Sequence, residues 1–541
     1  MAFQQFFENH FTWIEGFMRN VRRYANKPAM ICPDVDRTWT YSELNSDVNR
    51  LCNAFATDDL KKGDVIMLLM PNCPEFAISY IAAHKMHAVC CPVNYRLSCG
   101  ELGFLLDDSK PAILIFDETY RALALEAVKH SLNKPRKLIA VGGTSDNAIV
   151  SFDDYAGNCT DDEPAYTCDY NIYDETLRFY TSGTTGRPKG VPLTSINEVM
   201  SAHDTMIQYS ISSKDVTMNA TPWFHRGGMH CTGPGPCFYA GATIVVMGKF
   251  TPDITLKNVI KYKVSYIVGV PALFEDLADK QEQKGYDLSC LRGIISMGSP
   301  LERAACLRFQ KVLSPNVFNG YGTTEMHFAT ILRPFDLPDY SGAAGTSCVD
   351  DDVRVVKIYD DRRAEPDDLL PCDNMEVGEV IISSPNQSSY QYFNNSEATE
   401  SKFYKGFFYT SDLATWDENG FLTILGRKDD MIISAGENIY PVEVETVLKK
   451  HPKVKDSIVT AVPDKVNGQT VTAYVVRNDD SLTPEELDDF CKDSPDLANF
   501  KRPRYYRFVS QIPTNAMNKK QHFIIKETAF LDLKNGLLYK V

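Results

Sequence analysis

The sequence of 541 residues has no long hydrophobic run, no cluster of basic residues and no Cys-x-x-Cys pair. Its apolar runs, such as residues 65–70, are far shorter than the roughly 20 residues that a membrane helix requires, so we expect no membrane span. The net charge of −15, without a Lys/Arg-rich segment, disfavours nucleic-acid binding. The 15 scattered cysteines favour a reduced compartment over a disulfide framework or a zinc site. No secretory signal pattern opens the chain, and we expect a cytoplasmic protein.

Length and hydrophobic pattern indicate an α/β protein of two or more domains. The hydrophobic content of 44% can supply large cores, and the chain exceeds the usual size of one domain. Short β-branched runs alternate with helix-like stretches, as α/β folds require. The strands expected from these runs are residues 65–70, 89–93, 113–116, 138–141, 243–247 and 266–270.

A capping box predicts the start of one early helix. Thr40 and Glu43 have the required types and spacing. The apolar residues that follow share one helical face, which we expect to lie in the core: Leu44, Val48, Leu51 and Phe55.

The pattern beyond about residue 427 indicates a second, smaller domain. A helix is expected to begin at Pro441, with strands at residues 457–462 and 471–476. Thr483 followed by Pro484 predicts the start of another helix. We therefore expect a large N-terminal domain of β-sheets flanked by helices, residues 1–426, and an α+β C-terminal domain, residues 427–541.

Residues 180–191, Tyr-Thr-Ser-Gly-Thr-Thr-Gly-Arg-Pro-Lys-Gly-Val, have the composition of a phosphate-binding loop. Glycines allow close approach of the backbone to an anion, and hydroxyl groups can donate to phosphate oxygens. Arg187 and Lys189 add positive charge. The segment is not a Walker A loop, because Arg187 and Pro188 separate the second glycine from the lysine.

Four further segments follow in order: residues 319–325 (NGYGTTE), 409–412 (YTSD), 426–441 (GRKDDMIISAGENIYP) and 513–519 (PTNAMNK). With residues 180–191 they resemble the motifs of the adenylate-forming superfamily, which includes acyl-CoA and aryl-CoA synthetases, stand-alone adenylation domains and firefly-type luciferases. The resemblance spans roughly residues 30 to 525. It implies the same large and small domains, with a C-terminal domain that is mobile about a hinge at residues 427–430, centred on Asp429.

The resemblance also implies binding of ATP, Mg²⁺ and CoA. Glu325 would approach Mg²⁺, Tyr321 would stack on the purine, and Asp412 would accept hydrogen bonds from the ribose hydroxyls. Ser411 departs from the family, where a glycine precedes the aspartate. The residues so assigned to catalysis are Thr184, Lys189, Glu325 and Lys519, and those assigned to ATP or AMP are Thr181, Ser182, Gly183, Thr185, Gly186, Ser299, Asn319, Gly320, Tyr321, Gly322, Thr324, Asp412 and Arg427.

By the same resemblance, Lys519 would bridge the substrate carboxylate and the α-phosphate during adenylation. Lys520 adjoins it, which leaves the register open by one position, and similarity to the aryl-CoA ligase branch favours Lys519. Gly436 would line the tunnel for the pantetheine of CoA, where a Cβ atom would obstruct. Phe500 and Arg502 would contact the adenine and the 3′-phosphate of CoA.

Residues 222–228 resemble the family segment that lines the acyl pocket, so Trp223, His225 and Arg226 are expected to be wall residues. Gly298 and Gly320 would leave room for a flat or bulky group. Two orientations of Arg226 remain open: toward a polar substituent or second carboxylate of the substrate, or toward the CoA channel.

We therefore expect an AMP-forming ligase that joins a carboxylic acid, aromatic or cyclic, to CoA. Alternatives within the ligases are medium-chain fatty acids and dicarboxylates. A stand-alone adenylation enzyme that loads a carrier protein, a luciferase-type oxygenase and a non-catalytic relative also remain open. The oligomeric state is undetermined, with a homodimer as one possibility.

Overall fold

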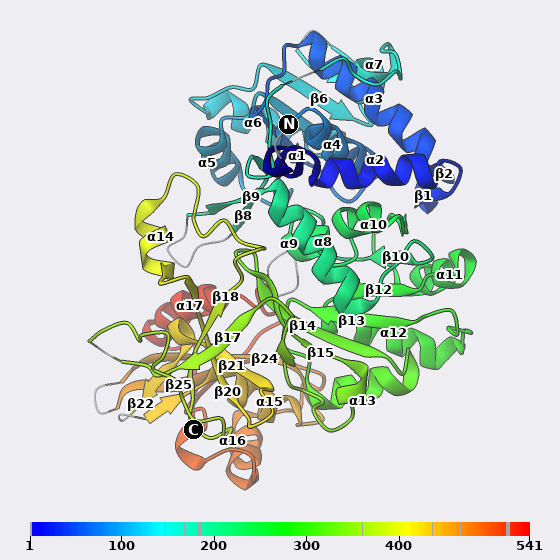
Figure 1. Cartoon of the computed structure of the whole chain (residues 1–541). Coiled ribbons are helices and arrows are strands. Elements are labelled where there is room, and N and C mark those ends of the chain that lie inside the picture. The colour runs from blue at the N-terminus through cyan, green and yellow to red at the C-terminus, as the bar shows by residue number, and fades with distance from the viewer. Residues whose placement is uncertain are drawn as a thin grey trace. The chain divides into compact units, whose positions relative to one another are not determined.

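The computed structural model describes residues 3–146, 148–166, 168–181, 187–359, 361–434, 437–464, 467–514 and 520–541 (Figure 1). The chain forms two compact units, of which the first comprises Met1–Val353 and Ile382–Phe408 and the second Arg354–Ile381 and Tyr409–Val541. The α/β architecture with a large and a small part is confirmed. The domain boundary expected after residue 426 follows the hinge motif rather than packing, and it stays a prediction.

The first unit contains a seven-stranded sheet with the order β7-β6-β5-β3-β4-β8-β9. All its neighbouring strands run parallel except β8 and β9, which form an antiparallel hairpin. Its inner strands are buried on both faces, as their continuous apolar runs require. The strands are β3 (Val65–Leu69), β4 (Val89–Pro92), β5 (Ile113–Asp117), β6 (Lys137–Val141), β7 (Val150–Ser151), β8 (Glu175–Thr181) and β9 (Lys189–Thr194).

A nine-stranded sheet completes the first unit, with the order β16-β15-β14-β13-β12-β10-β11-β1-β2. From β14 to β1 the strands are parallel, and antiparallel strands close both edges. The strands are β1 (Pro28–Cys32), β2 (Arg37–Thr40), β10 (Val216–Asn219), β11 (Thr243–Val245), β12 (Tyr266–Gly269), β13 (Gly293–Met297), β14 (Val317–Thr323), β15 (His327–Leu332) and β16 (Thr346–Ser347). The six strands expected from β-branched runs are all present in the two sheets.

The described helices of the first unit flank these sheets (Figure 1). In α3 (Tyr41–Thr57) the capping box of Thr40 and Glu43 forms as predicted, and the expected apolar face is fully buried. The other helices are α1 (Phe3–His10), α2 (Trp13–Arg23), α4 (Pro74–Lys85), α5 (Cys99–Ser109), α6 (Arg121–His130), α7 (Phe152–Gly157), α8 (Ser195–Tyr209), α9 (Arg226–His230), α10 (Pro234–Ala240), α11 (Pro252–Tyr262), α12 (Pro271–Lys284), α13 (Arg303–Val312) and α14 (Ser396–Lys402).

A five-stranded sheet has the order β17-β18-β20-β19, and β21 also pairs with β20. Its strands are β17 (Asp352–Val356), β18 (Gly378–Ser383), β19 (Phe403–Tyr404), β20 (Phe407–Trp416) and β21 (Leu422–Arg427).

The described part of the second unit also contains a six-stranded sheet and the helices α15, α16 and α17. The strand order is β23-β22-β25-β26-β27, and β24 pairs with β25. Both predicted helix starts are confirmed, since α15 begins at Pro441 and the Thr483 side chain caps α16. The elements are β22 (Ile432–Ser434), β23 (Glu437–Ile439), α15 (Pro441–Lys449), β24 (Val454–Asp464), β25 (Gly468–Arg477), α16 (Pro484–Asp493), β26 (Tyr505–Phe508), α17 (His522–Lys534) and β27 (Tyr539–Lys540).

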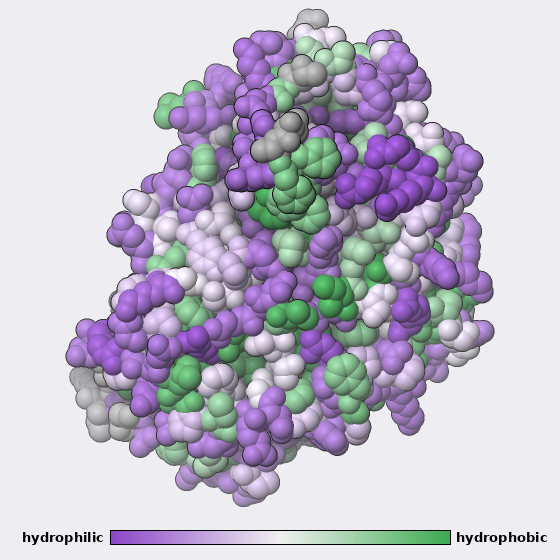
Figure 2. Space-filling view, in the orientation of Figure 1, coloured by the Kyte–Doolittle hydropathy of each residue, from purple (hydrophilic) through white to green (hydrophobic). Residues whose placement is uncertain are grey.

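The face of the molecule in Figure 2 is largely hydrophilic, and hydrophobic residues gather over α1 and at smaller places elsewhere on this face. This short helix leaves Phe3, Phe6 and Phe7 exposed. None of the helices in the described part of the chain combines the length and the hydrophobicity that crossing a bilayer requires.

Candidate functional site

The carboxyl ends of neighbouring parallel strands bring several predicted residues to one edge of the nine-stranded sheet. Ligands of α/β sheets bind at this edge. Gly298, at φ +80°, and Ser299 follow β13, while Tyr321 lies near the end of β14. The Asn319 side chain donates to the carbonyl oxygen of Ala343, 3.2 Å away, and is buried. Asn319 therefore fixes the backbone at Ala343 beside this edge of the sheet.

The tight connection from β14 to β15 places Glu325. A Cβ atom on Gly322 would lie 1.7 Å from the carbonyl oxygen of His327, so only glycine fits where the two strands approach. The Thr323 hydroxyl accepts a hydrogen bond from the amide of Met326 at 3.1 Å and fixes the turn. Glu325 sits inside this turn and is only 8% exposed.

Tyr392 joins Glu325 to the lysine that follows the glycine-rich loop. Its hydroxyl donates to Glu325 Oε1 at 2.6 Å, and Lys189 Nζ lies 5.2 Å from the centroid of its ring. The neighbouring Phe393 forms an antiparallel bridge with Gly190, whose Cβ position lies 3.0 Å from the Phe393 Cβ. The aromatic run at residues 390–393 was the only sequence signal for Tyr392, and sequence reasoning missed it.

The carboxylate of Glu325 suits Mg²⁺, which is usually held by one or two carboxylates together with substrate phosphates. The single buried carboxylate of Glu325 fits a magnesium ion that arrives with a nucleotide. Glu325 would hold it, and the ion would neutralise phosphate charge.

The glycine-rich segment connects the two strands of the hairpin β8–β9. Thr181 ends β8 and pairs with Lys189, the first residue of β9. Five predicted phosphate-binding residues between them lie outside the described residues: Ser182, Gly183, Thr184, Thr185 and Gly186.

Arg226, at the start of α9, is buried at 2% exposure and joins three segments of the first unit. It donates to the carbonyl oxygen of Thr324 at 2.7 Å, to that of Gln387 at 2.6 Å and to the hydroxyl of Ser201 at 3.1 Å. Burial lowers the pKa of Arg226 to about 10, so the guanidinium stays charged at neutral pH. Arg226 therefore holds the residue that precedes Glu325, a role beyond the two orientations considered from the sequence.

The residues expected to line the acyl pocket are packed closely. Trp223 is 1% exposed, and its ring meets Phe76 edge-on at 5.5 Å. Burial, aided by the charge of Arg96, lowers the pKa of His225 to about 4, so its imidazole is neutral at pH 7. This state fits a wall residue.

The expectation of open space at Gly320 is corrected by the structure. A Cβ atom on Gly320 would lie 2.9 Å from the ring of Phe328 and 3.2 Å from the Tyr209 hydroxyl. The space beside this glycine is filled by aromatic side chains, because β14 and β15 pair directly here.

In the second unit, Asp412 and Arg427 face each other across β20 and β21, and the guanidinium donates to Asp412 Oδ1 at 3.0 Å. Asp429 lies 4.0 Å from the same guanidinium. Ser411 has φ +62°, in the left-handed region that favours glycine, which explains why the family carries glycine at this position. The serine adopts the turn at a cost of about 1 kcal/mol.

The candidate CoA residues Phe500 and Arg502 lie on a short turn of the second unit. Phe500 is 46% exposed and can present its ring to a base. Arg502 forms an ion pair with the buried Asp488. A phosphate at this position would therefore compete with Asp488 for the guanidinium. Gly436 and Lys519 lie outside the described residues.

Comparison with known proteins gives matches over most of the chain. A family model described as AMP-binding enzyme matches residues 17–392, and one described as AMP-binding enzyme C-terminal domain matches residues 443–519. The chain is 30% identical to 2-succinylbenzoate–CoA ligase of Bacillus pumilus, with 92% of this chain and 95% of the relative covered. It is 32% identical to feruloyl-CoA synthase of an Amycolatopsis species, with 89% and 92% covered.

A solved structure shares the fold. The o-succinylbenzoate CoA synthetase of Bacillus subtilis, in complex with its acyl-adenylate intermediate, superimposes with a TM-score of 0.81 at 27% identity. The match covers 94% of this chain and 97% of that chain.

The acidic surroundings of Arg226 lead to a prediction about stability and pH. Burial raises the pKa of Asp351 to about 7, and the nearby carboxylates of Asp204 and Asp350 act in the same direction. Between about pH 4 and pH 7 the folded protein keeps the proton on Asp351, whereas the unfolded chain loses it. The free energy of unfolding therefore falls as the pH rises through this range. Asp351→Asn should therefore raise the free energy of unfolding at pH 8 by about 1–2 kcal/mol.

Urea titrations at pH 8 and pH 5 check this prediction, and the gain should shrink by more than half at pH 5. Asp339→Asn, at an exposed position of the same unit, provides the control and should change little at either pH. An equal gain from Asp351→Asn at both pH values would contradict the assignment.

Proposed function

The chain belongs to the AMP-binding enzyme family, and from this premise we propose that it is an AMP-forming carboxylic acid:CoA ligase. The resemblance to the adenylate-forming superfamily is thereby confirmed. In the proposed reaction a carboxylate oxygen attacks the α-phosphorus of ATP and pyrophosphate leaves. The thiol of CoA then attacks the acyl carbon of the acyl-adenylate, AMP leaves, and the thiol proton passes to solvent.

The contact of Glu325 with Tyr392, beside Lys189, is the observation that carries this proposal. It brings a carboxylate suited to Mg²⁺ and a cation suited to phosphate oxygens together at the base of a glycine-rich hairpin loop. Bound Mg²⁺ would neutralise charge on the departing pyrophosphate. Lys189 would hold the β- and γ-phosphates, and Tyr392 would fix the orientation of the Glu325 carboxylate.

The pair Asp412 and Arg427 would serve the nucleoside. Asp412 Oδ1 accepts from Arg427, and the carboxylate can accept further hydrogen bonds from the two ribose hydroxyls. The strand register of β20 and β21 sets this pair before any ligand binds. Such preorganisation favours binding because less ordering is needed on association.

Lys519 is proposed as the lysine that neutralises charge between the carboxylate and the α-phosphate. The contacts of its neighbour support this choice of register. Lys520 Nζ lies 3.0 Å from both Glu445 Oε2 and Asp456 Oδ1, and its side chain is mostly buried. Reaching a substrate would require Lys520 to leave two carboxylates, which costs free energy.

An aromatic or cyclic acid is the proposed substrate. Two relatives have names that specify aromatic acids, succinylbenzoate and ferulate.

The experiment that tests the function measures release of AMP and pyrophosphate from ATP. The acids should include benzoates, phenylpropenoates, cyclic, fatty and dicarboxylic acids and amino acids, each with and without CoA. We expect AMP release that depends on CoA with an aromatic or cyclic acid. Pyrophosphate exchange that ignores CoA would instead indicate a carrier-protein acceptor, and no turnover with any acid would contradict the proposal.

Tyr392→Phe should weaken the binding of Mg²⁺. Without the hydroxyl, the Glu325 carboxylate loses the hydrogen bond that orients it, so the Mg²⁺ concentration for half-maximal adenylation should rise about tenfold. Tyr390→Phe is the matched control, since its hydroxyl accepts from the amide of Ser384 rather than contacting Glu325. A similar rise in both variants would show that the hydroxyl of Tyr392 has no special role.

Lys519→Ala should separate the two half-reactions. The rate of adenylate formation should fall by about 10²–10³-fold, because a positive charge that acts in the transition state is lost. Transfer of a supplied acyl-adenylate to CoA should stay within about threefold of wild type, because that step does not use this charge. Measuring each half-reaction in a rapid-quench assay checks this, and equal loss in both would overturn the role of Lys519.

A further inference from the structure

Helix α9 contacts the turn that carries Glu325 from both of its ends. At the start of the helix, Arg226 donates to the carbonyl oxygen of Thr324 at 2.7 Å. At its end, the ring of His230 meets that of His327 edge-on, with the ring centroids 5.7 Å apart. Thr324 directly precedes Glu325, and His327 follows it closely. The residues that fix α9 therefore also fix the turn on which the proposed magnesium ligand lies.

One face of α8 holds α9 in place. Glu198, Ser201 and Thr205 follow one another at spacings of three and four residues, so their side chains lie on the same side of the helix. The Ser201 hydroxyl accepts a hydrogen bond from Arg226 at 3.1 Å. The carbonyl oxygen of His230 accepts from the Thr205 hydroxyl, and its Nε2 donates to Glu198 Oε1, each at 2.7 Å. Side chains of one helix thus bind both ends of the other.

Glu198 is a buried anion at this contact. It is 0% exposed and also accepts from the Tyr80 hydroxyl at 2.6 Å, while His84 Nε2 lies 3.5 Å from the same oxygen. Burial opposes ionisation of Glu198, but His230 and His84 together hold its pKa below the ordinary value. Burial lowers the pKa of Arg226, and Glu198 contributes most among the charges that oppose this lowering. Glu198 therefore supports one end of α9 by a hydrogen bond and the other by its charge.

We propose that Glu198 is a positioning residue that acts through α9 on Glu325 and so sets the affinity for Mg²⁺, and this inference rests on the proposed function. A metal ligand binds well when the groups behind it hold its orientation, and loss of such a group typically weakens metal binding by about 10- to 100-fold. The Glu198 carboxylate acts at a distance, through α9 and then the turn. The smaller of these losses is therefore expected.

Glu198→Gln tests this inference, because it removes the charge and keeps the size of the side chain. Titration calorimetry measures ATP binding with Mg²⁺ and with EDTA, in the absence of any acid, so that no turnover occurs. The factor by which Mg²⁺ tightens ATP binding should fall by about tenfold. The affinity for ATP in EDTA should stay within about twofold of wild type, because Glu198 acts through the metal ligand.

Two further variants change the same path. Tyr80→Phe removes a donor to Glu198 without adding an atom, and it should lower the Mg²⁺ factor by about threefold. Arg226→Lys removes the planar fork that reaches Thr324, and it should act about as strongly as Glu198→Gln. The double variant E198Q/R226K should be little weaker than either single variant, since both changes act on one turn. Tyr80→Phe decides the question where Glu198→Gln does not fold.

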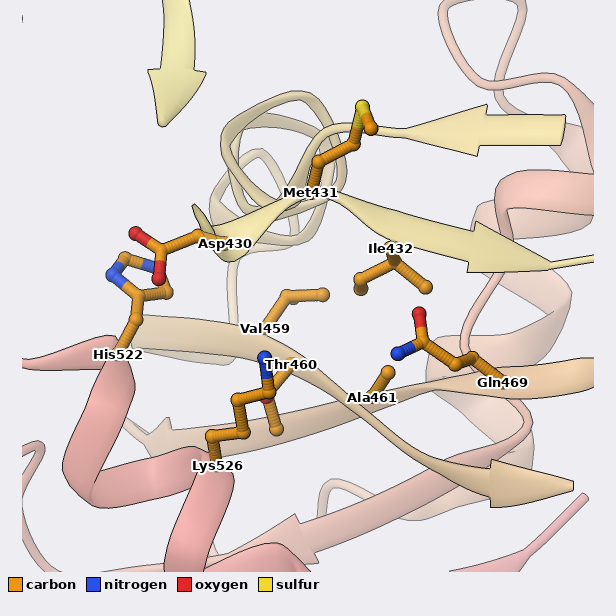
Figure 3. A pocket seen from close by; sticks show the side chains of 9 residues that line it. All are labelled: Asp430, Met431, Ile432, Val459, Thr460, Ala461, Gln469, His522 and Lys526. Carbon is orange, nitrogen blue, oxygen red and sulfur yellow. The ribbon is translucent and has the colours of Figure 1, made fainter. Parts of the chain in front are cut away.

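Glu445→Gln is the matched control for loss of a buried glutamate that is bonded to an imidazole. Glu445 is 5% exposed and accepts from His522 at 2.9 Å. In Figure 3 the His522 side chain points toward Asp430 at a small cavity of the second unit, whereas Glu325 belongs to the first unit. The replacement should lower the melting temperature and leave the Mg²⁺ factor unchanged. The melting temperature of every variant is measured beside its ATP affinities.

The outcomes separate this inference from the proposed function. If wild type forms no adenylate with any acid, the proposed function fails and the inference falls with it. If wild type forms adenylate, but Glu198→Gln and Tyr80→Phe weaken ATP binding equally with and without Mg²⁺ or change neither affinity, the positioning role alone is overturned. A loss confined to the Mg²⁺ factor in both variants, and absent from Glu445→Gln, supports it.

Discussion

The buried guanidinium of Arg226 joins three segments of the first unit. Moving a guanidinium from water into a protein interior costs several kcal/mol, and hydrogen bonds must offset this cost. Arg226 meets the requirement with two carbonyl oxygens and one hydroxyl, drawn from α8, from the turn before Glu325 and from the segment around residue 387. Nearby carboxylates, Glu198 first among them, favour its charge. The same contacts that make the burial tolerable also fix the backbone on which the proposed magnesium ligand sits.

In the second unit a buried carboxylate, that of Glu445, joins separate segments of the chain. Glu445 is a buried anion held by an imidazole, an ammonium group and a backbone amide, and it anchors the start of α17. In both units a buried charge with several hydrogen-bond partners joins segments that are distant in the sequence. A buried charge that lost its partners would cost several kcal/mol of stability. Other packings of these segments, which would break the contacts, are therefore disfavoured.

Local sequence patterns predicted the secondary structure well. The capping box at Thr40, the cap and proline at Thr483 and Pro484 and the β-branched runs act within a few residues, so these helix starts and six strands of the two large sheets could be placed without tertiary information. The sequence could not predict that Phe328 and Tyr209 fill the space beside Gly320. That outcome follows from the pairing of β14 with β15 and the packing of α8, which are long-range events.

The sequence by itself determined the family, the order of the motifs and the chemical types at the site, because these depend on which residues are present and how they are spaced. Only the tertiary structure decided which residues the side chains at the site contact. Tyr392 meets Glu325 across 67 positions, and Arg226 meets Thr324 across 98. Lys520 likewise forms ion pairs with Glu445 and Asp456, which are distant from it in the sequence. No local pattern encodes such contacts, since folding alone brings the partners within hydrogen-bonding distance.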